Sequence, residues 1–264
     1  MFDPAAIYQG EIRHLPANSA SRQLADELFQ ALADCYPELD DPRDAEGRMA
    51  PDVFRQRLRQ LQQEVRQGSH WRVRLEALYQ ELGIDLEDLR YDIPNLKCVP
   101  SQPLPDWYYQ RYYIAHRDTW SAQPQCQINW WLALHPTPAS ANFAFYPDYF
   151  EQPVANNSDG IDYERMKVFY AFASPEKAAL AAPRTTELPA DARAERFDME
   201  AGDLIAFSAA QLHQTRPNTS GRLRFSLDFR SCLVSDYQAG RGAPNCDNHS
   251  SGSSFVDLLQ PEYG

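Results

Sequence analysis

Cysteine, net positive charge and long apolar runs are all scarce in this sequence of 264 residues. Its five cysteines are widely spaced and form no C-x-x-C pair, which is typical of a reducing compartment and argues against a disulfide framework. The formal net charge is −12, and no cluster of Lys and Arg offsets it. Nucleic acid and anionic membrane surfaces are therefore unfavourable partners. No apolar run approaches the ~18 residues that a membrane-spanning helix needs.

The first residues also lack the basic and apolar stretches of a secretory signal, so we expect a cytoplasmic protein. What is present is the composition of an ordinary globular protein, with 43% hydrophobic residues and a length that suits one large domain. We expect a single domain over residues 1–264, with a mostly helical part at 1–94, a β core at 95–235 and a loop-rich tail at 236–264. The Gly, Ser and Asn residues of 238–254 predict either a flexible linker or a loop over the mouth of a barrel.

Helical periodicity is confined to the first third of the chain. Apolar residues recur at helical spacing over 19–36, 51–67 and 70–83, whereas residues 1–18 predict an irregular arm. Short β-type runs separated by turns follow at 96–99, 107–115, 127–134, 142–146, 167–172, 204–208 and 223–232. Helices first and strands afterwards favour an α+β fold, mainly β, with the N-terminal helices packed outside the β core.

The most informative chemical pattern is a His and a carboxylate two residues apart. His116 and Asp118 come at the end of a predicted strand, where that spacing points both side chains to one face. A second imidazole, His213, follows the distant strand 204–208. Two imidazoles and one carboxylate are the facial triad of non-haem iron(II) enzymes, which leaves three metal positions open. The alternative for His116 and Asp118 is an ordinary ion pair at a strand end.

Residues 223–230 alternate strictly between apolar and polar side chains. In a barrel with helices packed outside, the apolar face points outward, so Arg224 and Ser226 point into the lumen. An Arg in a barrel interior is costly unless an anion pairs with it, and a ligand carboxylate held by the guanidinium and a hydroxyl is a natural partner. The alternative is an amphipathic strand with its Arg side chains in solvent.

The order of these motifs resembles the iron(II)- and 2-oxoglutarate-dependent dioxygenase superfamily, in particular the branch related to phytanoyl-CoA dioxygenase and ectoine hydroxylase. The matching series is H-x-D, W-L-A-L at 131–134, G-D at 202–203, L-H, P-N and R-x-S, and it covers about residues 95–232. The resemblance implies a double-stranded β-helix (jelly-roll, cupin-like) barrel. It also implies a hydroxylase that acts on an unactivated C–H bond of a small metabolite and releases succinate and CO2. Iron(II), 2-oxoglutarate and O2 would be its cofactors.

The resemblance further implies roles for individual residues. His116, Asp118 and His213 would hold the metal. The far carboxylate of 2-oxoglutarate would pair with Arg224, eleven residues after the distal His. The other residues expected at the cosubstrate are Thr215, Ser226, Tyr113, Trp131 and Gln127. Candidate contacts for the substrate are Arg111, Trp120, Asn129, Tyr146 and Arg230.

Two features of the sequence bear on specificity. The P-G-S-H of the family is replaced by Tyr146-Pro147-Asp148-Tyr149, so substrate identity does not carry over. The carboxylate of Asp118 resembles the hydroxylases and disfavours halogenation. A protein hydroxylase, and a metal-binding cupin-type barrel without oxygenase activity, are the alternative functions. Desaturation, ring closure and epimerisation are alternative outcomes of the same chemistry.

Overall fold

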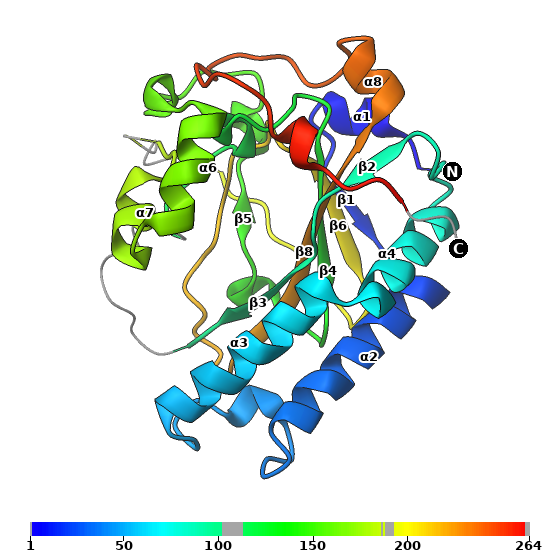
Figure 1. Ribbon diagram of the computed structural model, residues 1–264, viewed down its shortest axis with the longest axis vertical. Coiled ribbons are helices and arrows are strands. Elements are labelled where there is room, and N and C mark those ends of the chain that lie inside the picture. The colour runs from blue at the N-terminus through cyan, green and yellow to red at the C-terminus, as the bar shows by residue number, and fades with distance from the viewer. Residues whose placement is uncertain (1, 102–112, 186, 188–192, 262–264) are drawn as a thin grey trace.

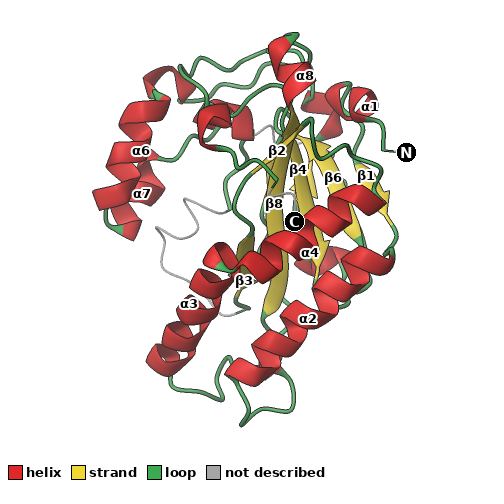
Figure 2. Ribbon diagram, turned by 45° about the vertical axis from the view of Figure 1, so that its right-hand side comes forward, coloured by secondary structure: helices red, strands yellow, loops and turns green. Residues whose placement is uncertain are grey.

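The computed structural model describes residues 2–101, 113–185, 187 and 193–261 of the chain. Its centre is an antiparallel sheet that carries three long helices on one face and a two-stranded sheet on the other (Figures 1 and 2). Helices α6 and α7 stand apart from these helices, beyond the two-stranded sheet (Figure 1). The prediction of an α+β fold with helices packed on a β core is confirmed.

The three long helices are α2 (Ser19–Cys35), α3 (Pro51–Gln67) and α4 (Ser69–Glu81). Each predicted helix is therefore present, with ends within two residues of those expected. Helix α2 begins at a capping box in which Asn18 and Ser21 satisfy each other's backbone amides. Helix α3 begins with Pro51, whose fixed φ suits a first helical position, and ends at Gly68. The remaining α-helices of the described residues are α1 (Pro4–Tyr8), α6 (Tyr163–Phe172), α7 (Pro175–Ala181) and α8 (Val234–Gln238).

The strands form two sheets within the described residues. The strands are β1 (Arg13–Leu15), β2 (Leu89–Tyr91), β3 (Asn95–Val99), β4 (Ile128–Ala133), β5 (Ala144–Phe145), β6 (Leu204–Ser208), β7 (His213–Gln214) and β8 (Arg224–Leu233). The large sheet has the order β1-β6-β4-β8-β2, with β3 also paired to β8, and β5 pairs with β7 in the small sheet. Every pairing is antiparallel.

The central strands are buried on both faces because their side chains alternate between two apolar layers. In β4, Trp130 and Leu132 pack toward the helices, and Trp131 packs toward the small sheet. The same period of two sends Phe225 of β8 to the helix side and leaves Arg224 on the opposite, inner face. The inner face of the large sheet is therefore the face that meets the small sheet and the candidate site.

Two predictions of secondary structure are wrong. Residues 167–172, expected as a strand, are part of α6, because Val168, Phe169 and Phe172 lie at helical spacing and Asp162 caps the helix by accepting from the amide of Arg165. The expected irregular arm contains α1 and β1, since Arg13–Leu15 pairs with β6. The predicted strand at 107–115 lies mostly outside the described residues. In the described part of the chain, no helix has the length and apolar character to cross a bilayer.

Candidate metal centre

The fold brings His116, Asp118 and His213 together at one end of the small sheet. Candidate ligand atoms of the three side chains all lie within 4.8 Å of one another. The two histidines occupy paired backbone positions: the amide of His116 donates to the carbonyl of His213 at 2.9 Å, and the reverse bond is 3.0 Å. Their ring centroids are 4.4 Å apart. Among the described residues, this is the one group of His, Cys, Asp and Glu side chains arranged to hold a metal ion.

Backbone carbonyls fix the orientation of both imidazole rings. Nδ1 of His116 lies 3.0 Å from the carbonyl oxygen of Ile114, and Nδ1 of His213 lies 2.9 Å from that of Gln211. A carbonyl oxygen only accepts, so each Nδ1 carries the proton and donates it. In the neutral form of each ring, Nε2 is then the unprotonated nitrogen, which is the atom that coordinates a metal.

A chain of two amides orients the carboxylate. Asn129 of β4 donates from Nδ2 to Oδ2 of Asp118 at 2.7 Å, and Gln127 donates to Oδ1 of Asn129 at 2.9 Å. The other carboxylate oxygen, Oδ1, lies 3.5 Å from Nε2 of His116 and faces the centre. Asn129, expected at the substrate, therefore holds a candidate ligand. Gln127, expected at the cosubstrate, is fully buried behind Asn129.

The electrostatics of the site favour an ionised carboxylate on Asp118 and a neutral ring on His213. Burial alone would raise the pKa of Asp118, but its hydrogen bond with His116 and the charge of Arg230 hold it well below its usual range. Burial, assisted by the neighbouring His116, lowers the pKa of His213 to about 4. Burial also opposes the charged form of His116, yet the contact with Asp118 raises the pKa of that ring. The donor set thus carries a negative charge and aims two nitrogens and one oxygen at one point, which fits a divalent transition metal.

The polar residues predicted on strand 223–230 lie on the inner face of the large sheet. Arg224 is 4% exposed; its guanidinium carbon lies 5.7 Å from the ring centroid of Trp131, and Nη1 donates to the carbonyl of Ala141 at 3.2 Å. Ser226 is fully buried, with Oγ 3.4 Å from Oδ1 of Asp228. The interpretation of Arg224 as a solvent-facing residue of an amphipathic strand is therefore wrong.

Arg230 lies further along the same face of β8. Its Nη1 is 2.9 Å from Oδ2 of Asp92, and its Nε is 3.8 Å from Oδ2 of Asp118. The side chain remains 40% exposed, so it keeps a charged surface beside the candidate metal ligands.

The other predicted site residues are distributed around this centre. Tyr146 is buried and donates to Oε1 of Gln214 at 2.5 Å, and Nε2 of the Gln214 side chain donates to the backbone carbonyl of Tyr113. Thr215 follows β7 and is half-buried. Trp120 is fully buried, which leaves its side chain no surface for a substrate. Arg111 lies outside the described residues.

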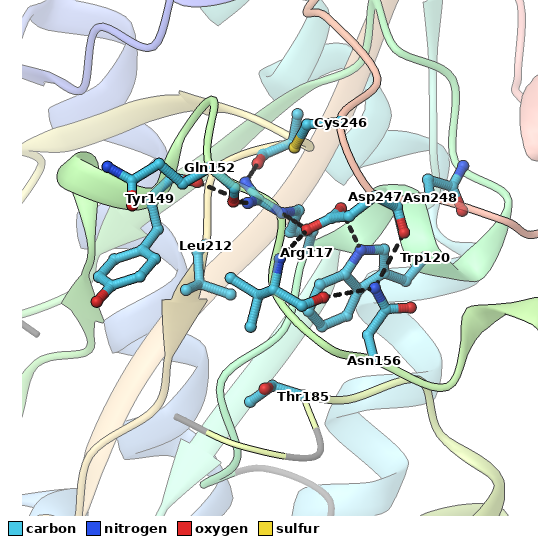
Figure 3. A network of polar contacts seen from close by, with 12 residues as sticks. Arg117, Trp120, Tyr149, Gln152, Asn156, Thr185, Leu212, Cys246, Asp247 and Asn248 are labelled. Carbon is cyan, nitrogen blue, oxygen red and sulfur yellow. Dashed lines mark hydrogen bonds and ion pairs between the residues drawn. The ribbon is translucent and has the colours of Figure 1, made fainter. Parts of the chain in front are cut away.

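Sequence reasoning missed the residue between the first two candidate ligands. Arg117 is 1% exposed and donates from Nε to Oδ2 of Asp247 at 3.0 Å (Figure 3). Asp247 lies in the Gly- and Ser-rich segment for which a flexible linker was one expectation, and that segment is instead packed against the ligand-bearing loop. No local pattern in the sequence places residue 247 beside residue 117. An Arg inside an H-x-D motif was the one available signal.

Solved structures of similar fold exist at low sequence identity. EvdO2 from Micromonospora carbonacea var. aurantiaca, complexed with 2-oxoglutarate, aligns over 88% of this chain and 91% of its own, with a TM-score of 0.51 and 13% identity. Another EvdO2 structure aligns over 61% of this chain and only 59% of its own, with a TM-score of 0.40 and 15% identity. The epimerase SnoN, in complex with Fe3+, alpha ketoglutarate and nogalamycin RO, aligns over 87% and 82%, with a TM-score of 0.47 and 16% identity.

The first of these alignments shows that the chain shares the fold of EvdO2. No protein-family model matches the sequence, and no curated protein matches it.

Proposed function

We propose that this chain is an iron(II)- and 2-oxoglutarate-dependent oxygenase built on a jelly-roll core, of the phytanoyl-CoA dioxygenase-like branch. The observation that carries the proposal is the convergence of candidate ligand atoms from His116, Asp118 and His213 within 4.8 Å. The fold shared with EvdO2, whose structure holds 2-oxoglutarate, supports the same class. When bound, iron and its cosubstrate supply the oxidising power for attack on an unactivated C–H bond, with O2 consumed and succinate and CO2 released.

The protein's part in this proposal is to hold the metal with three side chains and to leave the opposite side open. Nε2 of His116, Nε2 of His213 and Oδ1 of Asp118 are the three ligand atoms. Asn129 keeps the second carboxylate oxygen occupied, so that Asp118 offers one oxygen to the metal. The carbonyls that bind each Nδ1 keep both rings in the coordinating tautomer.

Arg224 supplies the proposed anchor for the cosubstrate. A guanidinium that is 4% exposed, on the same inner face as the metal centre, can grip a carboxylate bidentately in a site of low dielectric. Trp131 lies beside the guanidinium carbon and would flank the bound chain. Thr215, Ser226 and Tyr113 complete the proposed cosubstrate pocket.

The proposed substrate is a small metabolite. Arg230 presents a half-exposed cation next to Asp118, so a substrate with a polar or anionic group fits this region, and Tyr146 remains a proposed contact. Arg111 remains a proposed contact. Product analysis would separate hydroxylation from desaturation, ring closure and epimerisation.

The test of the proposal needs no substrate. Metal-free protein is mixed with iron(II) and 2-oxoglutarate without oxygen, and the visible charge-transfer band of the chelate is titrated. We expect a band in the wild type, no band in His213→Ala, and a requirement for far more 2-oxoglutarate in Arg224→Ala. Arg222→Ala is the matched control, because Arg222 pairs with Asp41 and Asp44 outside the inner face.

Wild-type protein that binds the metal but gives no band with 2-oxoglutarate would contradict the proposal and favour a cupin-type barrel without oxygenase activity. An equal loss of 2-oxoglutarate affinity in Arg222→Ala and Arg224→Ala would remove Arg224 from its assigned role.

A further inference from the structure

Arg117 stands between two candidate metal ligands but points away from the metal centre. Its backbone is extended, with φ −109° and ψ 140°, and successive side chains of extended chain point to opposite sides. His116 and Asp118 face the centre, and the Arg117 side chain enters the protein behind them. There it is 1% exposed, a costly position for a cation unless its donors are satisfied.

The guanidinium satisfies its donors with three other segments of the chain, at 149–152, 210 and 247. Nη1 donates to the carbonyls of Ala210 at 2.5 Å and Phe150 at 3.2 Å. Nη2 donates to the carbonyls of Tyr149 at 2.6 Å and Gln152 at 2.9 Å. Nε donates to the carboxylate of Asp247, which is the one charged partner in this set (Figure 3).

Through Ala210 the same side chain also reaches the second histidine. Ala210 lies in the turn 208–211, which is closed by the amide of Gln211 on the carbonyl of Ser208 at 2.9 Å. The carbonyl of Gln211 in turn holds Nδ1 of His213. Arg117 therefore connects the loop of His116 and Asp118 to the turn that orients His213.

Asp247 is itself fixed from three sides, so it can hold the guanidinium in place. Its Oδ1 accepts from Nε1 of Trp120 at 2.8 Å, and its Oδ2 accepts from the amide of Val154 at 3.0 Å as well as from Arg117. Its backbone carbonyl accepts from Nδ2 of Asn156 at 2.9 Å. Figure 3 shows these contacts converging on Asp247 from the ligand loop and the segment around residue 155.

We infer that Arg117 and Asp247 are positioning residues that set the affinity and geometry of the metal centre. The segment around Asp247 is thereby part of the site, although it offers no ligand to it. This inference rests on the proposed metal-binding function. Loss of residues that hold metal ligands in place weakens metal binding by about 10–100-fold in other proteins.

The test titrates metal-free protein with Co(II) and follows the visible absorption of the bound ion, without 2-oxoglutarate or turnover. We expect Asp247→Asn to keep a wild-type circular dichroism spectrum, to bind Co(II) about tenfold more weakly or worse, and to show a shifted band at saturation. Arg117→Lys keeps the charge but loses the planar fork of donors, so we expect an effect of the same sign.

Two controls separate positioning from general effects. Asp257→Asn removes another short carboxylate–cation pair, in which Oδ2 of Asp257 lies 2.6 Å from Nζ of Lys167. Asp257 is close to Asp247 in the sequence, but this pair is exposed, so the substitution should leave the Co(II) titration unchanged. Leu32→Ala, in the fully buried helix layer, lowers stability far from the site and should also retain wild-type affinity.

A folded Asp247→Asn variant with the Co(II) affinity and band of the wild type would overturn the inference. If Asp247→Asn does not fold, Arg117→Lys decides the matter in the same assay; if neither folds, the pair serves folding and the inference is likewise overturned. Failure of the proposed function looks different: wild type without a Co(II) band, or His213→Ala with wild-type binding.

Discussion

Nε of Arg117 lies 3.0 Å from Oδ2 of Asp247, although 130 residues separate the two in the sequence. Their side chains are 1% and 5% exposed, so neither charge is shared with water. A buried pair of this kind gains little over an apolar pair, but removal of one partner leaves an uncompensated charge in a medium of low dielectric.

Asp247→Ala should therefore lower the free energy of unfolding by about 3–5 kcal/mol. Asp257→Ala, which breaks the exposed pair with Lys167, should cost no more than about 1 kcal/mol. Urea denaturation of both variants measures the difference. Equal losses would show that burial of the Arg117 pair has no energetic consequence.

Asn129 donates a hydrogen bond directly to a candidate ligand, so its removal should lower the affinity for the metal. Asn129→Ala frees Oδ2 of Asp118, and we expect metal affinity to fall by about 10–100-fold. Gln127→Ala acts one hydrogen bond further out and should have a smaller effect. Calorimetric titration with Mn(II) provides the comparison, and a larger effect of Gln127→Ala would contradict the proposed chain of support.

His135 makes two hydrogen bonds, and the one that its ring accepts requires the neutral form. Nε2 accepts from the amide of Phe225 at 3.0 Å, and Nδ1 donates to the carbonyl of Pro136 at 2.9 Å. Burial lowers the pKa of His135 from 6.5 to about 4.

The unfolded chain binds a proton on this ring below about pH 6.5, whereas the folded chain binds one only below about pH 4. The contribution of His135 to stability is therefore complete above pH 6.5 and is lost as the pH falls toward 4, by roughly 3 kcal/mol in total. His135→Gln keeps an acceptor and a donor but does not titrate. Urea denaturation at pH 7 and pH 5 should show a smaller loss of stability in the variant, and an identical loss in both proteins would refute this assignment.

The two apolar layers of the large sheet predict which core substitutions lower the stability of the protein most. Leu132 is fully buried on the helix side of β4, and Leu132→Ala should cost about 2–5 kcal/mol. Phe172 of α6 is 88% exposed, and Phe172→Ala should change stability by no more than about 0.5 kcal/mol. Thermal unfolding of the pair checks the contrast, and a cost for Phe172→Ala near that of Leu132→Ala would show that α6 packs on the body of the protein.

Features written in local sequence were predictable, and features that depend on distant segments were not. Pro51 and Gly68 mark the ends of α3, and strict alternation marks β8, because each signal lies within or directly beside the element that it specifies. Strand β1 has three residues and exists only because β6 lies beside it, so no local pattern announces it. Residues 167–172 of α6 were predicted as a strand because they include residue types that favour strands. The N-cap at Asp162 was the stronger signal, and it indicates a helix.

The candidate metal centre shows the same division. His116 and Asp118 share one short motif, and the predicted strand before His213 indicated where a third ligand would arrive. The alternation along the strand placed Gln127 and Asn129 on the correct face. They were expected at the cosubstrate and at the substrate, because alternation gives the face on which a residue lies and not the group that it contacts. The pairing of Arg117 with Asp247 depends on the path of the chain after β8, which alternation and spacing do not encode.

The alternation of β8 also bears on how the protein can vary by mutation. A single-residue insertion or deletion in the middle of 224–230 would exchange the two faces for the residues on one side of the change, and so would turn either Arg224 and Phe225 or Phe229 and Arg230 to the wrong face. Both the packing and the chemistry would be lost in one event, with no partially working intermediate. Viable homologues should therefore differ in this strand by substitution alone, and changes of chain length should collect in the connections that follow β5 and precede β6.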